Sequence, residues 1–175
     1  MDKILVLYKS KYGATKKYAN MLKEELGCEI LKIEDWNPSL SDDYDSIVFA
    51  GAVYASGIGG IDILRKNYDK LKNKKTAVFC VGASPYDEKA IADVKEHNMK
   101  GELKNVPLFY GRGAWDEKAM NFKDRMLCKM LQKAIGKKDP ANYEPWMAAL
   151  MEAAGQKCDW TDRSYLVPLI EYLQQ

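Results

Sequence analysis

A short polar segment directly follows the first apolar run of the chain and has the composition of an anion-binding turn. The run "ILVLY" at 4–8 passes into "KSKYGATKK" at 9–17. A turn that enters a helix brings free backbone N–H groups and the positive end of the helix dipole to one point. Ser10 and Thr15 add hydroxyl donors, and Gly13 permits close approach of a ligand to the backbone. The segment therefore predicts a phosphate site, unless Ser10 or Thr15 only caps the helix.

Two further segments combine small residues with an aromatic ring. The segment "AGAVYASGIGG" at 50–60 contains four glycines and Tyr54, which suits a backbone lying close to a flat ligand with a ring face beside it. A flexible glycine loop with Tyr54 in the core is the alternative. The segment "VGASPYDE" at 81–88 is similar, although Ser84 and Asp87 are also ordinary turn or cap residues.

The elements that would position these loops alternate along the chain. Apolar runs rich in β-branched and aromatic residues predict strands at 3–8, 29–33, 46–51, 76–82 and 106–111. Helical spacing predicts a first helix that ends at Gly27, and further helices at 59–72 and 87–98. This pattern is typical of an α/β fold, a doubly wound five-stranded parallel sheet in the order 2-1-3-4-5. Ligands of such sheets lie at the carboxyl ends of the strands, where the winding reverses between the first and third strands.

The last third of the chain is less regular, and we expect it to belong to one domain spanning 1–175. A helix is predicted at 117–138, with apolar residues mostly on one side. Those residues are Met120, Leu127, Met130, Leu131, Ala134 and Ile135. The segment 136–163 has no clear periodicity, and Pro168 is expected to begin or kink a final helix.

Residues 112–138 form a basic segment. They include eight Lys or Arg residues and three acids, which gives a local net charge of +5. A basic face of this kind could contact an anionic membrane surface as a peripheral protein, or an acidic partner or anionic substrate. A core-facing helix with a solvated lysine face is the alternative. The net charge of the whole chain, +2, predicts no particular partner, and we expect no nucleic acid among the partners.

Composition excludes several classes of protein. Apolar residues make up 47% and charged residues 30%, which is typical of a globular protein. No apolar run approaches the roughly 20 residues of a membrane span and no signal-peptide pattern is visible, so we expect a cytoplasmic protein. The four cysteines are far apart and His97 is the only histidine, which argues against a metal site and against a disulfide framework. We expect four reduced thiols, with Cys28 and Cys80 packed in strands, and an exposed His97.

The first two loops resemble those of a known superfamily. The segment "YKSKYGATKKYA" resembles the phosphate loop of the flavodoxins, and "FAGAVYASG" resembles their second flavin-contacting loop. The segments "LFYGRGAWDEKAMNFKDRMLCKML" and "KCDW" resemble the flavodoxin-domain branch that includes the menaquinone-dependent protoporphyrinogen dehydrogenases. The resemblance implies a flavodoxin-like fold and a non-covalent FMN cofactor.

The resemblance also implies the residues that contact the flavin. For the phosphate they are Ser10, Tyr12, Gly13, Ala14, Thr15 and Lys16. For the ribityl chain and ring system they are Ala52, Val53, Tyr54, Ala55 and Gly57. For the other side of the flavin they are Gly82, Ala83, Ser84, Tyr86, Gly111, Arg112 and Trp115.

The function expected from this resemblance is electron transfer through FMN, as a redox protein or oxidoreductase. The alternatives are a protoporphyrinogen IX dehydrogenase that reduces a quinone, and a pure electron carrier. The partner would accordingly be a redox protein, a quinone or a small-molecule substrate. No side chain is expected to be catalytic, because the flavin carries the chemistry.

Two other classes share features with this chain. A signalling receiver domain has the same strand order, but it needs acidic residues that are absent at 8–10 and 51–53. A binding module without a cofactor stays open, and it would gain no flavin absorbance on adding FMN.

Overall fold

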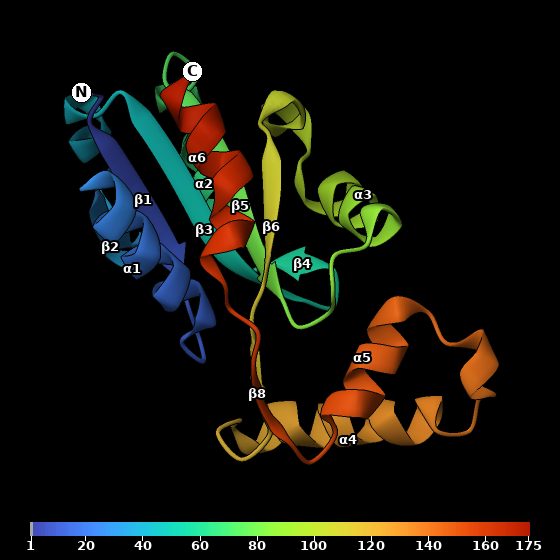
Figure 1. Cartoon of the computed structure of the whole chain (residues 1–175). Coiled ribbons are helices and arrows are strands. Elements are labelled where there is room, and N and C mark those ends of the chain that lie inside the picture. The colour runs from blue at the N-terminus through green and yellow to red at the C-terminus, as the bar shows by residue number, and fades with distance from the viewer. Residues whose placement is uncertain (1) are drawn as a thin grey trace.

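Five parallel strands form the centre of the computed structural model, which describes residues 2–175 (Figure 1). In chain order they are β1 (Ile4–Lys9), β2 (Glu29–Lys32), β3 (Ser46–Tyr54), β5 (Lys75–Gly82) and β6 (Leu108–Arg112). Their order across the sheet is β2-β1-β3-β5-β6, which confirms the predicted doubly wound arrangement. Because β1 pairs with β2 on one side and with β3 on the other, the winding reverses between β1 and β3.

Helices cover both faces of the sheet and bury an apolar cluster on each. On one face lie α1 (Ala14–Leu26) and α6 (Val167–Gln174), whose Tyr18 and Leu169 pack on the strands. On the other face lie α2 (Ile61–Asn67) and α3 (Glu88–Asn98), which bury Leu64 against the sheet. The expected ends of two helices are confirmed, since Gly27 is the left-handed C-cap of α1 and Pro168 lies in the first turn of α6.

The third strand is longer than the predicted 46–51. It continues to Tyr54 and turns back as β4 (Gly57–Ile58), which pairs antiparallel with it. The glycines after Gly51 suggested a loop, but Val53 and Tyr54 favour an extended chain and the turn needs only two residues. Ala52, Val53 and Tyr54 are therefore strand residues rather than parts of a flexible loop.

Other elements differ from the prediction mainly at their ends. The helix expected at 59–72 is α2 followed by a 3-10 turn, and the helix expected at 117–138 is α4 (Phe122–Ile135). The irregular segment 136–163 contains α5 (Pro145–Ala153), which begins at a proline, and β8 (Lys157–Asp159). The 3-10 turns are Ile33–Asp35, Pro38–Asp43, Tyr68–Lys70, Gly101–Asn105, Pro140–Asn142 and Arg163–Leu166.

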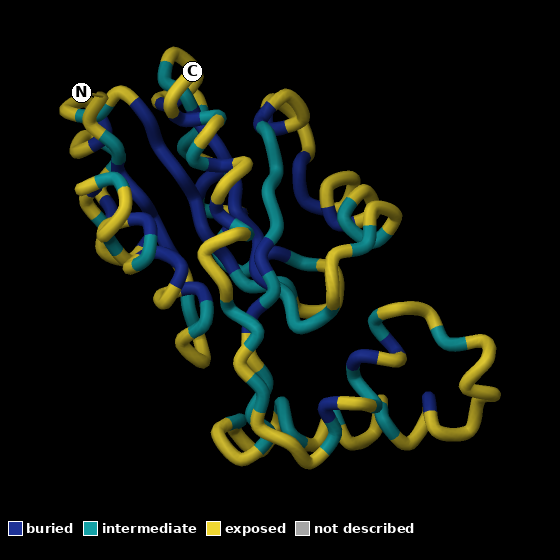
Figure 2. The backbone as a smooth tube through the Cα atoms, in the orientation of Figure 1, coloured by how far each residue is buried: buried dark blue, intermediate teal, exposed yellow. Residues whose placement is uncertain are grey.

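Beyond β6 the chain leaves the sheet and forms a separate group of elements, residues 114–159, which we call the lobe. The strand β7 (Ala114–Asp116) pairs antiparallel with β8, and this ribbon leads to α4 and α5 (Figure 1). Most of the lobe is exposed, whereas the sheet is buried (Figure 2). The alternative of a core-facing α4 is therefore wrong. No face of the sheet is left for α4 to cover, because α1, α6, α2 and α3 already cover both faces.

The four cysteines are free thiols. Cys80 lies inside β5, but Cys28 lies directly before β2 rather than in a strand, and burial raises the pKa of Cys28 to about 11 and that of Cys80 to about 12. His97 is exposed, as predicted. Within residues 2–175 no helix has the length and apolar character needed to cross a membrane.

Candidate cofactor site

The N-terminus of α1 is free of side-chain caps and opens at the carboxyl end of β1. Gly13 precedes the helix with φ +102, a left-handed conformation that favours glycine. The Ser10 hydroxyl accepts a hydrogen bond from the Gly13 N–H at 3.1 Å, and the helix itself has no capping side chain and no acid in its first turn. Ser10 and Thr15 therefore do not cap α1. Within the described chain no acceptor faces the backbone N–H groups of residues 14–16, which remain free donors.

The lysines around this turn differ in their pairing. Three of them form ion pairs, Lys9 with Glu34 at 3.0 Å, Lys11 with Asp124 at 2.5 Å, and Lys17 with Asp159 at 2.6 Å. Among residues 2–175, Lys16 has no carboxylate partner, and it is exposed. The free donors of α1 and the Lys16 ammonium together suit a phosphate group.

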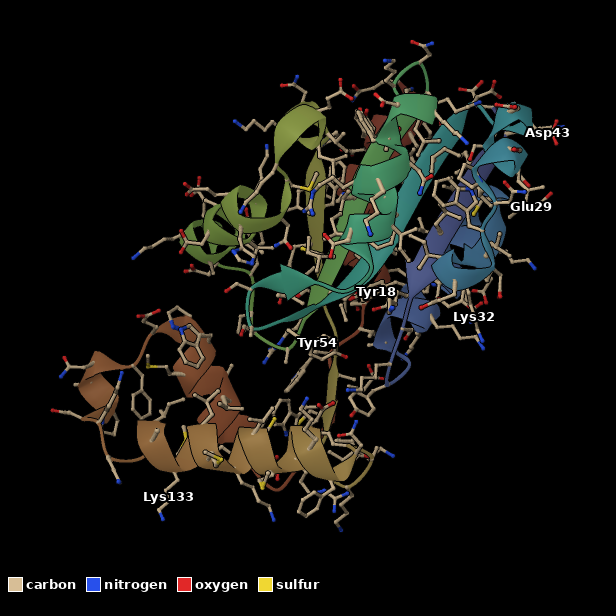
Figure 3. The ribbon with its side chains drawn as sticks, turned by 180° about the vertical axis from the view of Figure 1, so that it is seen from behind. Tyr18, Glu29, Lys32, Asp43, Tyr54 and Lys133 are labelled. Carbon is tan, nitrogen blue, oxygen red and sulfur yellow. The ribbon has the colours of Figure 1, made fainter. Side chains whose placement is uncertain are left out.

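Tyr54 lies at the tip of β3, directly before a strained turn. The two turn residues, Ala55 with φ +47 and Ser56 with φ +66, are both left-handed, which is the geometry of a type I′ hairpin turn. Left-handed backbone costs a non-glycine residue roughly 1–2 kcal/mol. The Tyr54 side chain is 49% exposed and faces the lobe (Figure 3), so the alternative that places Tyr54 in the core is wrong.

Asn98, at the end of α3, holds this hairpin in place. Its buried side-chain amide donates to the Ser56 carbonyl at 2.6 Å and to the Val94 carbonyl at 2.7 Å. Its carbonyl accepts from the Ile58 N–H at 2.8 Å. Asn98 was not among the predicted site residues, because an asparagine at the end of a helix carries no local sign of a partner 40 residues away.

The third loop, 82–86, is fixed from the side of β6. The carbonyls of Gly82, Ala83 and Ser84 accept hydrogen bonds in turn from the Gly113 N–H, the Arg112 Nε and the Tyr110 hydroxyl. Asp87 caps α3 through the Ala90 N–H at 2.8 Å, in agreement with its alternative role. Tyr86 is 60% exposed and leaves a second aromatic face at this edge of the sheet.

Gly111, Arg112 and Trp115 lie farther along β6 and β7. A side chain at Gly111 would come within 2.5 Å of the Phe79 ring. The Arg112 guanidinium, besides holding Ala83, stacks 3.9 Å from the centroid of Trp160. Trp115 lies opposite Cys158 in the ribbon, and its buried indole N–H has no acceptor within the described residues. Arg112 thus supports the third loop through a hydrogen bond, and Gly111 allows β6 to pack closely on the Phe79 ring.

Tyr12 and Lys11 lie in the turn between β1 and α1, which we call the first loop, and they connect it to the lobe. The Tyr12 hydroxyl donates to Asp124 Oδ2 at 2.5 Å and accepts from the Asn121 N–H at 3.2 Å. Lys11 Nζ lies 2.5 Å from the same carboxylate oxygen, and it lies 6.0 Å from the centroid of the Tyr54 ring. The Lys11 ammonium, with the Tyr12 hydroxyl, lowers the pKa of Asp124, and the carboxylate raises the pKa of Lys11. Asp124 was also not among the predicted site residues, since its partners are more than a hundred residues away.

The residues predicted for one ligand thus share one edge of the sheet. The first loop and the hairpin follow β1 and β3, which flank the reversal of the winding, and the third loop follows β5. The free donors at 14–16 suit a phosphate, and the exposed rings of Tyr54 and Tyr86 suit a flat aromatic group. The Tyr12 hydroxyl is hydrogen-bonded to Asp124 of α4, and a contact of Tyr12 with the phosphate stays a prediction.

Comparison with known proteins identifies the family of the chain. The profile of the flavodoxin domain family matches residues 5–142. A search of curated protein sequences finds no significant match.

Several solved structures resemble the chain. A candidate flavoprotein from Bacteroides eggerthii is 16% identical with a TM-score of 0.50, and the match covers 79% of this chain and 100% of that chain. A WrbA-like flavodoxin from Agrobacterium tumefaciens is 20% identical with a TM-score of 0.48, covering 71% and 88%. A flavoprotein from Lactobacillus acidophilus in complex with FMN is 17% identical with a TM-score of 0.40, covering 64% and 93%.

The likeness to the Bacteroides structure concerns the fold, whereas the match to the family profile concerns the sequence. That match begins in β1, includes all three loops and ends beyond α4. The chain belongs to the flavodoxin domain family.

Proposed function

We propose that the protein binds FMN and transfers electrons through it. One observation carries this proposal: the uncapped N-terminus of α1 opens at the same sheet edge as the exposed rings of Tyr54 and Tyr86. The phosphate would lie on residues 13–16, and the ring system would lie beside residues 52–57 and 82–86. Bound FMN supplies the one- or two-electron step.

The residues of the chain would then bind and orient the cofactor. The N–H groups of residues 14–16 and the Lys16 ammonium donate to the phosphate oxygens, which are doubly charged near neutral pH. Tyr54 and Tyr86 cover the ring system and exclude water from its faces. Asn98 and Arg112 hold the two ring-binding loops by hydrogen bonds, so the site is largely formed before the cofactor enters.

For the reaction, we propose the oxidation of a porphyrinogen or a related large flat substrate, with a quinone as electron acceptor. Support comes from α4, because Leu127 and Leu131 follow Asp124 by three and seven residues and share the helix side that meets the first loop. Both leucines are exposed, at 52% and 43%. An apolar wall on the side of α4 that meets the first loop suits an apolar substrate or a quinone better than the polar docking surface of an electron carrier.

The proposed cofactor is tested by titrating the purified protein with FMN and with riboflavin, which lacks the phosphate. We expect Lys16→Glu to weaken FMN binding by about tenfold or more, because a carboxylate replaces the free ammonium at the phosphate. Its affinity for riboflavin should change little. Lys23→Glu, the same charge change at an exposed position near the other end of the same helix, is the matched control. Release of FAD from the purified protein, or no binding of FMN, would contradict the proposal.

The proposed substrate is tested with the FMN-loaded protein, protoporphyrinogen IX and a menaquinone analogue. We expect protoporphyrin fluorescence to rise in proportion to the quinone reduced. Leu127→Asp should slow turnover without loss of FMN, because it places a charge on the apolar wall. If the loaded protein gives no turnover but exchanges electrons with a redox protein, the electron-carrier function is correct instead.

A further inference from the structure

The outer side of α4 presents a row of large apolar side chains to solvent. Phe122, Met126 and Met130 recur every four residues, so they share one side of the helix. They are 79%, 45% and 62% exposed, respectively. Together with Arg125, Lys129 and Lys133 they line a shallow open groove, and we call these six residues the outer face.

The charge of the outer face is entirely positive. Lys129 and Lys133 are exposed, and neither has a carboxylate partner anywhere in residues 2–175. Arg125 donates to the backbone carbonyls of residues 117, 118 and 120 rather than to an acid. The one acid of α4, Asp124, lies on the side that meets the first loop, where Lys11 pairs with it.

The position of α4 leaves this face unobstructed. The helix lies along the end of the molecule opposite the two chain termini, and Lys133 points away from the sheet (Figures 1 and 3). The neighbouring segment 139–153 contains three acids and no Lys or Arg. That segment contacts α4 on a side that includes the buried Ile135 of α4 rather than on the outer face. Its acids therefore do not belong to the outer face.

We propose that the outer face docks in the plane of an anionic lipid surface. Phe122, Met126 and Met130 would enter the boundary between headgroups and acyl chains, while Lys129 and Lys133 extend to the lipid phosphates. The 14 residues of α4 give about 21 Å of helix to lie along the surface. A lipid surface supplies both the negative charge that matches the lysines and the apolar medium that the three side chains need.

This docking would bring the cofactor site close to the lipid. The outer face and the Leu127 side lie on opposite sides of one helix, whose diameter with side chains is about 10–12 Å. If the proposed function is correct, a quinone dissolved in the bilayer could reach the flavin without crossing the bulk solvent. Docking itself does not depend on that function.

Sedimentation of the whole protein with lipid vesicles tests the proposal. We expect binding to phosphatidylcholine vesicles that contain phosphatidylglycerol, and about tenfold or more weaker binding to pure phosphatidylcholine. High salt should weaken the binding. The variants Lys129→Glu with Lys133→Glu, and Met126→Ser with Met130→Ser, should each weaken it by about tenfold or more. Lys89→Glu with Lys95→Glu, the same charge change on the exposed side of α3, is the matched control and should bind normally.

Three outcomes would overturn the proposal. The first is no sedimentation with anionic vesicles, and the second is normal binding by the lysine variant. The third is normal binding by the methionine variant, which would show a charge attraction without docking of the apolar row. Circular dichroism checks that each variant is folded. FMN titration of the same variants should be unchanged, so a failure of lipid binding is distinguishable from a failure of the proposed cofactor.

Discussion

Asn98 shows how one buried side chain can position a loop that is far away in the sequence. Its amide joins the Ser56 carbonyl, in the turn after Tyr54, to the Ile58 N–H of β4. Ala55 and Ser56 are left-handed without being glycine, so the turn has a conformation that costs free energy. The hydrogen bonds of Asn98 offset part of that cost and fix Tyr54 at the sheet edge.

Replacing Asn98 with leucine should lower the free energy of unfolding by about 2–4 kcal/mol, because the buried Ile58 N–H and the Ser56 carbonyl lose their partner. Urea unfolding measures this change, and faster hydrogen exchange of the Ile58 amide would locate it in the hairpin. Asn20→Leu is the control, since Asn20 is exposed on α1, and it should change stability by about 0.5 kcal/mol or less. Equal effects of the two substitutions would mean that Asn98 does not hold the hairpin.

The sequence predicts residues that act through their own backbone better than residues that act through distant partners. Gly13 and Thr15 could be placed at the start of α1, because a glycine and a hydroxyl at the start of a helix are local signals. Asn98 and Asp124 were missed because their contacts join segments 40 or more residues apart. The contact of Tyr12 with α4 was not predictable either, since nothing in its own segment shows that α4 lies beside it.

At the scale of elements, α4 shows what an apolar pattern can and cannot predict. The spacing of apolar residues in 117–138 correctly predicts a helix, because the spacing depends only on the helical repeat. The spacing does not predict which surface, if any, covers those residues. The helix has apolar residues on more than one side, and only Ile135 is fully covered by the lobe.

In the hairpin β3–β4, the composition predicts the wrong element. Its glycines suggest a loop, yet β3 extends to Tyr54 and only Ala55 and Ser56 form the turn. Strand order, in contrast, was predictable, because short crossovers of one hand leave few arrangements for five parallel strands.

At the scale of the whole molecule, two carboxylates fasten the lobe to the sheet. Asp124 accepts from Lys11 and Tyr12 of the first loop, and Asp159 of β8 pairs with Lys17 of α1. The Lys17 ammonium and the Thr161 hydroxyl lower the pKa of Asp159 from 3.8 to about 2. Because the folded pKa is the lower one, each pair contributes its full stability above the ordinary pKa of aspartate and loses it as the pH falls.

We therefore expect part of the free energy of unfolding to be lost between about pH 4 and pH 2. The variant Asp124→Asn with Asp159→Asn should be less stable than the native protein near neutral pH and should show a smaller loss over that acid range. Urea unfolding at several pH values measures both slopes. Asp42→Asn with Asp43→Asn, on exposed positions far from the lobe, is the control and should keep the native slope. Equal slopes for all three proteins would show that these anchors do not respond to pH.

The two strands of the ribbon, β7 and β8, join the lobe to the rest of the chain, and the residues next to their outer ends are hydrogen-bonded. The Trp160 N–H donates to the Gly113 carbonyl at 2.9 Å, so the chain enters and leaves the lobe at nearly the same point. In topological terms the lobe is an insertion between the last strand of the sheet and the segment that leads to α6. Insertions with adjacent ends can be gained, lost or exchanged without redrawing the parent fold. The sheet and its three loops could thus be inherited as one unit, while the insertion diversifies the surface to which that unit is delivered.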